Sequence, residues 1–204
     1  PDGIVLHIGK IVDGDSISVG DEVVATICAA SREATMRNHT AAHLLQAALR
    51  ETLGSHVEQA GQLVNENAMR FDFTHFSALT PDEIHAINKA VGEMSLDGMD
   101  ITIREMSIDE AKKLGATALF GEKYGDSVRV VTMGDKSMEL CGGTHLDNTA
   151  KIGPFHIVSE GSVASGVRRI EAVTGNAFMR LVDEKNRMLR EASEYLKTTP
   201  ADLI

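Results

Sequence analysis

The sequence predicts an α+β fold in which antiparallel sheets pack with helices around a central helix that carries two histidines. Three observations lead to this prediction. Short β-rich runs bounded by Gly and Asp turns are typical of antiparallel hairpins. Two segments with helical periodicity, 31–53 and 80–96, are interspersed with the predicted strands. A third helical segment runs from Gly175 to a stop at Thr199-Pro200.

The composition excludes several classes of protein. The chain has 204 residues, 43% of them hydrophobic, so it can bury a sizeable core. Twenty Lys and Arg against thirty Asp and Glu give a net charge of 20 − 30 = −10. Nucleic acid would therefore have to bind at a local basic patch. The sequence contains neither a long apolar run nor a secretion signal, and we expect no membrane contact and a cytoplasmic location.

The chain is predicted to have three parts. Residues 4–28 alternate short β-rich runs with Gly-Asp turns, which predicts hairpins or part of a barrel. We therefore expect a partial β-barrel segment over 1–30, a core over 31–175 and a C-terminal helix over 176–204. Because the first residue is Pro1, a fragment of a longer protein is expected.

The core elements follow from caps and turns. Ser31 and Gly54 are the predicted start and stop of the first helix, and residues 56–73 are predicted to form a hairpin. Thr80-Pro81 begins the second helix, and the capping box of Ser107 and Glu110 begins a short one. The remaining strands are expected near 101–103 and at 128–133, 137–140, 155–159 and 167–173.

Two separated pairs of residues predict a metal site. His39 and His43 are four residues apart in a helix, so both imidazoles lie on one face. Cys141 and His145 flank two glycines, in a turn that lets both side chains point inward. Three imidazoles and one thiolate suit Zn²⁺ better than Mg²⁺ or Ca²⁺. Ordinary half-buried histidines and a purely structural zinc are the alternatives. Thr40 stands where a zinc protease of the HExxH type has Glu, which disfavours peptide hydrolysis.

Four blocks in this order resemble the editing domain of alanyl-tRNA synthetase. They are RNHTAAHLL (37–45), FGEKYGD (120–126), LCGGTH (140–145) and GVRRIEAVTG (166–175). The editing domain of threonyl-tRNA synthetase shares the histidine helix and the Cys/His turn, and free-standing editing proteins share all four blocks. The flanks, 1–30 and 176–204, look like the end of the preceding barrel and the helix that leads onward in the synthetase, which favours a synthetase fragment.

This resemblance implies a function. The family hydrolyses the ester of tRNA(Ala) that has been wrongly charged with serine or glycine. Such a second, hydrolytic site is needed because a binding pocket for alanine rejects neither amino acid strongly. It implies Zn²⁺ on His39, His43, Cys141 and His145. It also implies the acceptor end of tRNA(Ala) and the remainder of the synthetase as partners. Whether the ion activates water or holds the amino acid is left open, as is the oligomeric state.

Two residues near the predicted site are candidates for catalysis. The amide of Gln59 can donate to an ester carbonyl or a serine hydroxyl, and the resemblance also places it near the pocket; a solvent-facing strand residue is the alternative. The hydroxyl of Thr40 can read serine, or it can bond its own helix backbone.

Three cations are candidates for tRNA phosphates. Arg168 and Arg169 follow a stretch rich in Gly and Ser, and strand alternation lets only one of them face the site. We expect this to be Arg168, also as a catalytic candidate, whereas Arg169 can instead pair with Glu171 or a neighbour. Lys151 is a weaker candidate.

The metal motifs contain no conventional general base. We therefore expect a zinc-organised hydrolysis, in which water is held by neighbouring side chains or by the terminal ribose hydroxyl of the tRNA. A non-catalytic, zinc-stabilised tRNA-binding module is the main alternative, and a zinc amidase or esterase for a small molecule is a third.

Overall fold

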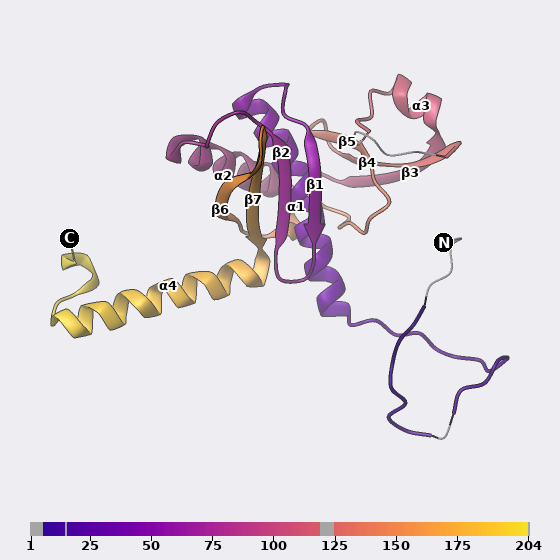
Figure 1. The fold of residues 1–204 in the computed structure, drawn as a ribbon, viewed down its shortest axis with the longest axis horizontal. Helices are drawn as coiled ribbons and strands as arrows, with labels where there is room; N and C mark the ends of the chain where they lie inside the picture. Colours follow the sequence, from indigo (N-terminus) through magenta and orange to yellow (C-terminus); the bar gives the residue numbers. More distant parts are fainter. Residues whose placement is uncertain (1–5, 15, 119–124, 204) are drawn as a thin grey trace.

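The structure, a computed structural model, describes residues 6–14, 16–118 and 125–203, and it has the α+β class predicted (Figure 1). Two antiparallel sheets are present in these residues, a four-stranded one of order β1-β2-β7-β6 and a three-stranded one of order β3-β4-β5. Of the predicted FGEKYGD block, residues 120–124 lie outside the described residues.

The four-stranded sheet brings distant parts of the chain together. The hairpin of β1 (Gln59–Val64) and β2 (Met69–Thr74) pairs through β2 with β7 (Val167–Thr174), which pairs in turn with β6 (Phe155–Ala164). Phe71, Phe73 and Ile170 point from this sheet into the core and are fully buried. The predicted hairpin over 56–73 is confirmed.

Helix α1 (Ala29–Leu53) runs behind this sheet and carries the two histidines (Figure 1). It starts two residues before the predicted Ser31, with Cys28 at the N-cap, and ends at Gly54 with a φ of 116°. Its middle is buried on nearly every side, including Leu44, Leu45 and Leu49. A helix packed from several sides holds its side chains in fixed positions, which suits it to carry a site.

Helix α2 (Pro81–Leu96) packs beside α1 and completes the main core with Ile87 and Val91. Thr80 caps it with a complete capping box, as Ser107 does for the short helix α3 (Ile108–Lys113). The smaller sheet consists of β3 (Ile101–Ser107), β4 (Ser127–Met133) and β5 (Ser137–Leu140). Two short 3-10 helices lie at Thr149–Ile152 and Pro200–Asp202.

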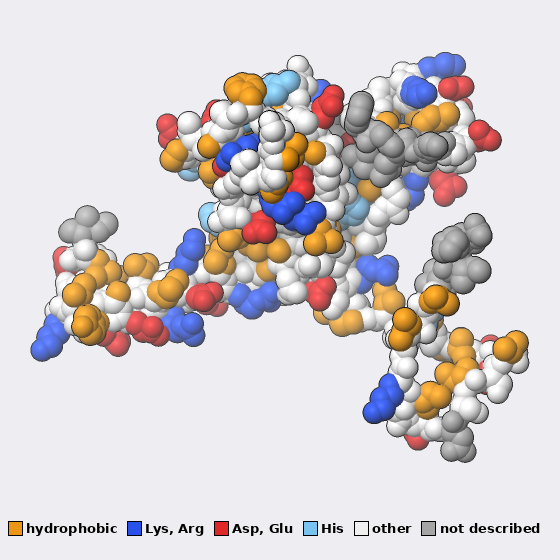
Figure 2. Space-filling model, in the orientation of Figure 1, with side chains coloured by type: hydrophobic (Ala, Val, Ile, Leu, Met, Phe, Trp, Pro, Cys, Tyr) orange, Lys and Arg blue, Asp and Glu red, His pale blue; other side chains and the backbone are white. Residues whose placement is uncertain are grey.

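Two segments project from the body (Figures 1 and 2). Residues 6–14 and 16–28 are exposed and form no strand, so the strands expected there are not formed, and the partial barrel stays a prediction. At the other end, α4 (Gly175–Leu196) extends away from the sheet and leaves most of its residues exposed. None of the helices among residues 6–14, 16–118 and 125–203 has the length and apolarity that crossing a bilayer requires.

Candidate metal centre

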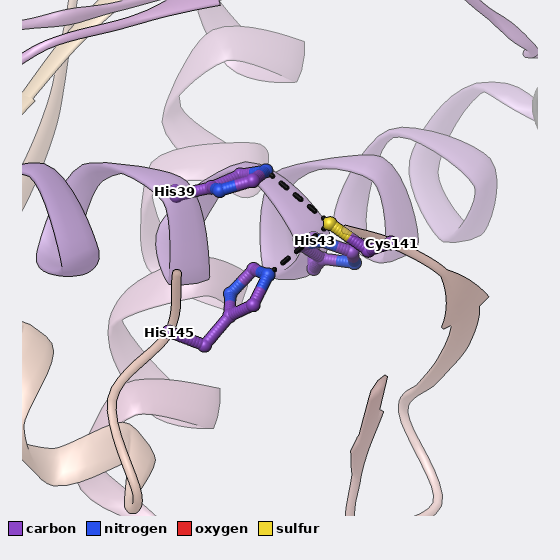
Figure 3. A group of neighbouring side chains, drawn as sticks. All are labelled: His39, His43, Cys141 and His145. Atoms are coloured by element: carbon purple, nitrogen blue, oxygen red, sulfur yellow. Dashed lines mark hydrogen bonds between the residues drawn. The ribbon is translucent and has the colours of Figure 1, made fainter. Parts of the chain in front are cut away.

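The four predicted ligands meet in one place (Figure 3). His39 and His43 project from α1, Cys141 follows the end of β5, and His145 lies four residues further on. One donor atom from each residue lies within 4.8 Å of the others. The Sγ atom of Cys141 is 3.2 Å from Nε2 of His145 and 3.6 Å from Nε2 of His39.

The turn that carries Cys141 and His145 is held from two sides. The Nη1 atom of Arg129 in β4 donates to the carbonyl oxygens of Cys141, at 2.8 Å, and of Gly143, at 2.5 Å. On the other side, Oγ1 of Thr40 accepts from the backbone N–H of Leu146 at 3.2 Å. These contacts hold the turn against β4 on one side and α1 on the other.

The charges at the cluster favour a thiolate. Burial would raise the pKa of Cys141, but hydrogen bonds from His145, His39 and His43 outweigh it and lower the pKa to about 3. Burial and the neighbouring histidines lower the pKa of His145 to about 4, which keeps that imidazole neutral. Burial would also lower the pKa of His43, but the carboxylate of Glu139 and the thiolate of Cys141 outweigh it and raise the pKa to about 10.

This donor set fits Zn²⁺. A thiolate sulfur and imidazole nitrogens are the groups that zinc takes in proteins, and the cluster offers one sulfur and three imidazole nitrogens. All four side chains are buried or half-buried, so none is merely an exposed polar group. The residues can therefore hold zinc.

Two further polar residues touch the cluster and were missed by sequence reasoning. Oε2 of Glu139 lies 3.0 Å from Nδ1 of His43, and its other oxygen accepts from the hydroxyl of Ser137 at 2.8 Å. Nε2 of Gln62 lies 3.3 Å from Nε2 of His39. The one signal for Glu139 was its place two positions before Cys141.

A β-bulge explains why Gln62 was missed. Gln59 and Gln62 are three apart, which in a regular strand puts them on opposite faces. The register shift between Gln59 and Gly61 adds one residue to the strand, so Gln59 and Gln62 lie on the same face. This face is that of Phe71 and Phe73, which is turned toward α1. Glycine inside a strand is a known signal for such a bulge.

Gln59 itself lies beside the cluster. It is half-buried and lines a cavity of about 100 Å³ together with Glu139, the carboxylate that contacts His43. From the sequence, Gln59 could equally lie at the pocket or face the solvent. Its half-buried position at this cavity favours the first interpretation. The cavity has room for only a few non-hydrogen atoms.

The hydroxyl of Thr40 contacts the turn that carries His145. Thr40 is fully buried, its Oγ1 atom accepts from Leu146 N–H, and the same atom lies 3.4 Å from Nδ1 of His145. The observed partner is therefore the distant turn and not the backbone of its own helix. A role of Thr40 in reading a substrate stays a prediction.

The two arginines occupy opposite faces of β7, as alternation predicted, but each is already paired. Arg168 makes two hydrogen bonds with Glu160, at 2.5 and 2.7 Å, and both side chains are largely buried. Arg169 makes two with Asp72 of β2, at 2.7 and 2.8 Å, rather than with Glu171. Arg168 lies on the face of its register partner Phe73, toward α1, and its guanidinium pairs with Glu160, so its role at the site stays a prediction.

Lys151 lies at the other side of the centre. Its Nζ atom is 2.7 Å from the carboxylate of Asp147, and it lines a larger cavity of about 640 Å³ that also touches His145. Basic and acidic side chains are interspersed over the face drawn in Figure 2. A phosphate role for any of the three cations remains a prediction.

Comparisons with known proteins agree with this geometry. A family model described as "Threonyl and Alanyl tRNA synthetase second additional domain" matches residues 128–171, which include Cys141 and His145. The alanine--tRNA ligase of Acetivibrio thermocellus is 58% identical over 203 residues, which is 100% of this chain and 23% of that protein. Alanine--tRNA ligase 1 of Lachnoclostridium phytofermentans is 53% identical over 99% of the chain, and the enzyme of Pelotomaculum thermopropionicum is 48% identical over 100%.

In each of these relatives the match covers 23% of the length, so the chain spans about a quarter of them. The resemblance found in the sequence is confirmed: over its whole length the chain matches a segment of alanine--tRNA ligases, and within it residues 128–171 match the second additional domain of threonyl and alanyl tRNA synthetases.

Proposed function

We propose that this chain is a hydrolytic editing module, which deacylates tRNA(Ala) mischarged with serine or glycine and uses Zn²⁺ held by His39, His43, Cys141 and His145. The observation that carries the proposal is that the four donor atoms converge, and that Glu139, which contacts His43, lines a cavity of about 100 Å³. A small cavity suits small aminoacyl groups, which are those that an alanine-specific enzyme mistakes.

The side chains around the centre have separate tasks. When bound, zinc supplies a Lewis acid that polarises or orients the aminoacyl ester. Glu139 and Thr40 hold the rings of His43 and His145 in place. Gln59 lines the cavity and has an amide that can donate to the ester carbonyl. Burial of the cluster excludes bulk water and strengthens each of these interactions.

The proposal extends to the partners and to the parts of the chain. The acceptor end of tRNA(Ala) is the substrate, and Arg168, Arg169 and Lys151 are candidates for its phosphates. Residues 1–30 are proposed as the end of a barrel, 31–175 as the editing core and 176–204 as the helix that leads to the next region of the synthetase. Each arginine would have to exchange its present carboxylate partner for a phosphate.

A deacylation assay tests the proposal. The purified chain loaded with zinc is given seryl-tRNA(Ala), glycyl-tRNA(Ala) and alanyl-tRNA(Ala), next to Cys141→Ala and to Glu93→Gln, an exposed position on α2. We expect turnover of the seryl and glycyl esters, its loss in Cys141→Ala together with bound zinc, and full retention in Glu93→Gln. Binding of tRNA without turnover would instead support the non-catalytic module.

A further inference from the structure

Gln46 places a polar group on the histidine-bearing face of α1. It is three residues after His43 and seven after His39, a spacing that keeps all three on one side of a helix. Only 6% of it is exposed. It lines the same cavity of about 100 Å³, and the other residues around this cavity are Arg50, Glu58, Gln59, Thr117, Ala118 and Glu139.

The orientation of the Gln46 amide is fixed by the backbone. Its Nε2 atom donates to the carbonyl oxygen of Val57 at 3.3 Å. If the amide were turned by 180°, its Oε1 atom would face this carbonyl oxygen and no hydrogen bond could form. The Oε1 atom is therefore the free end. It is buried, and it has no hydrogen-bond partner among the residues that the structure describes. A buried acceptor without a donor is costly, which makes it a place where a ligand donor is favoured.

The charges around the cavity indicate which donor this is. Glu58 and Glu139 bring two carboxylates to the cavity and Arg50 brings one guanidinium, so the acidic groups outnumber the basic one and attract the positively charged α-ammonium of an aminoacyl group. The amide oxygen of Gln46 is neutral and matches a neutral donor. A hydroxyl is the neutral donor that serine has and that alanine and glycine lack. Thr40, the other candidate for reading a hydroxyl, is engaged with Leu146.

We propose that Oε1 of Gln46 accepts a hydrogen bond from the side-chain hydroxyl of a bound seryl group, so that Gln46 determines specificity for serine. This inference rests on the proposed function, because it takes an aminoacyl ester as the ligand. It assigns no bond-making step to Gln46. A site built around a hydroxyl favours the ligand that has it over one that lacks it, since the acceptor otherwise stays unpaired.

The test compares Gln46→Met with wild type on two substrates. Met has a similar length but no amide oxygen, and Gln46→Glu is the control, because it keeps acceptor oxygens and shares the loss of the bond to Val57. We expect kcat/KM for seryl-tRNA(Ala) to fall by about 10-fold in Gln46→Met, with glycyl-tRNA(Ala) changed by less than about 2-fold. Gln46→Glu should keep most of the serine preference.

Two outcomes would overturn the inference. The first is an unchanged ratio of the seryl to the glycyl kcat/KM in Gln46→Met; if both values fall equally, the loss would point to the ammonium or to misfolding. The second is the same loss of serine preference in Gln46→Glu. Binding separates this result from the proposed function. Seryl, alanyl and glycyl amides of 3′-amino-3′-deoxyadenosine resist hydrolysis, and calorimetry should show tighter binding of the seryl amide, abolished by Gln46→Met. If the wild type binds the seryl amide more tightly but hydrolyses no ester, the proposed hydrolysis is refuted and the role of Gln46 in serine specificity stands. If the wild type binds the three amides equally, the role of Gln46 is refuted.

Discussion

At the scale of single residues, Gly143 sets how closely the Cys/His turn approaches α1. A Cβ atom added to Gly143 would overlap the ring of His39, at its Cε1 and Nδ1 atoms, whereas one added to Gly142 meets nothing within 4 Å. The two glycines of the turn therefore have different reasons to be glycine. At Gly143 there is no space for a side chain.

This difference predicts the behaviour of two matched variants. Gly143→Ala should push the His39 ring out of place and weaken zinc binding by about 10-fold or more, as loss of support around a ligand does. Gly142→Ala should bind zinc as wild type does. Chelator competition measures both affinities, and equal affinities in the two variants would contradict the steric argument.

The ligands could be predicted from the sequence, but the residues that support them could not. His39 with His43, and Cys141 with His145, each have local spacings that indicate metal chemistry. Glu139, Gln62 and Arg129 have none, because their contacts depend on how β1, β4 and β5 meet α1. The pairing of Arg168 with Glu160 could not be predicted for the same reason, since the two are neighbours only through the pairing of β6 with β7.

At the scale of elements, the pairing of β2 with β7 includes an ion pair on the outer face of the sheet. Asp72 and Arg169 are register partners, and two hydrogen bonds join their side chains. The hydrogen bonds from Arg169 lower the pKa of Asp72 below its ordinary value of 3.8, against the opposing effect of burial. The pair therefore contributes stability that depends on pH.

The sign of this dependence follows from the lowered pKa. Above pH 3.8 the stabilisation is fully present, and it is lost as the pH falls through the lower pKa of the folded state. Asp72→Asn should cost about 1–2 kcal/mol of unfolding free energy at pH 7, with a difference from wild type that shrinks in strong acid. The free energy of urea unfolding, measured from pH 7 to 2, tests this.

Glu93→Gln is the control, because Glu93 forms an exposed pair with Lys89. It should lower the unfolding free energy by less than about 0.5 kcal/mol. A cost for Asp72→Asn that does not change with pH would contradict the argument.

Caps and alternation predicted the elements of the core well, and the N-terminal segment shows where that reasoning stops. Thr80 and Ser107 cap helices because their partners Glu83 and Glu110 lie three residues away, within the reach of local sequence. The β-rich runs of residues 6–14 and 16–28 have a strand pattern but no strand, because a strand needs a neighbour to accept its hydrogen bonds.

At the scale of the whole molecule, the core carries its stability without the N-terminal segment. The described residues before Ala29 are exposed, and the main core is built from α1, α2 and the sheets. A chain shortened to begin at Cys28 should keep its zinc affinity, and its Tm should change by less than about 2 °C. Calorimetry with and without zinc measures this. A loss of several degrees would show that the segment packs on the core in solution.

The distance along the chain between the two halves of the centre has a consequence for biosynthesis. His39 and Cys141 are 102 residues apart, and the final ligand, His145, comes later still. A growing polypeptide on the ribosome therefore has only half of the coordination sphere until the LCGGTH turn has left the exit tunnel and the smaller sheet has docked. Under the proposed function, tight metal capture would consequently be a late event of maturation, because it requires both halves of the centre.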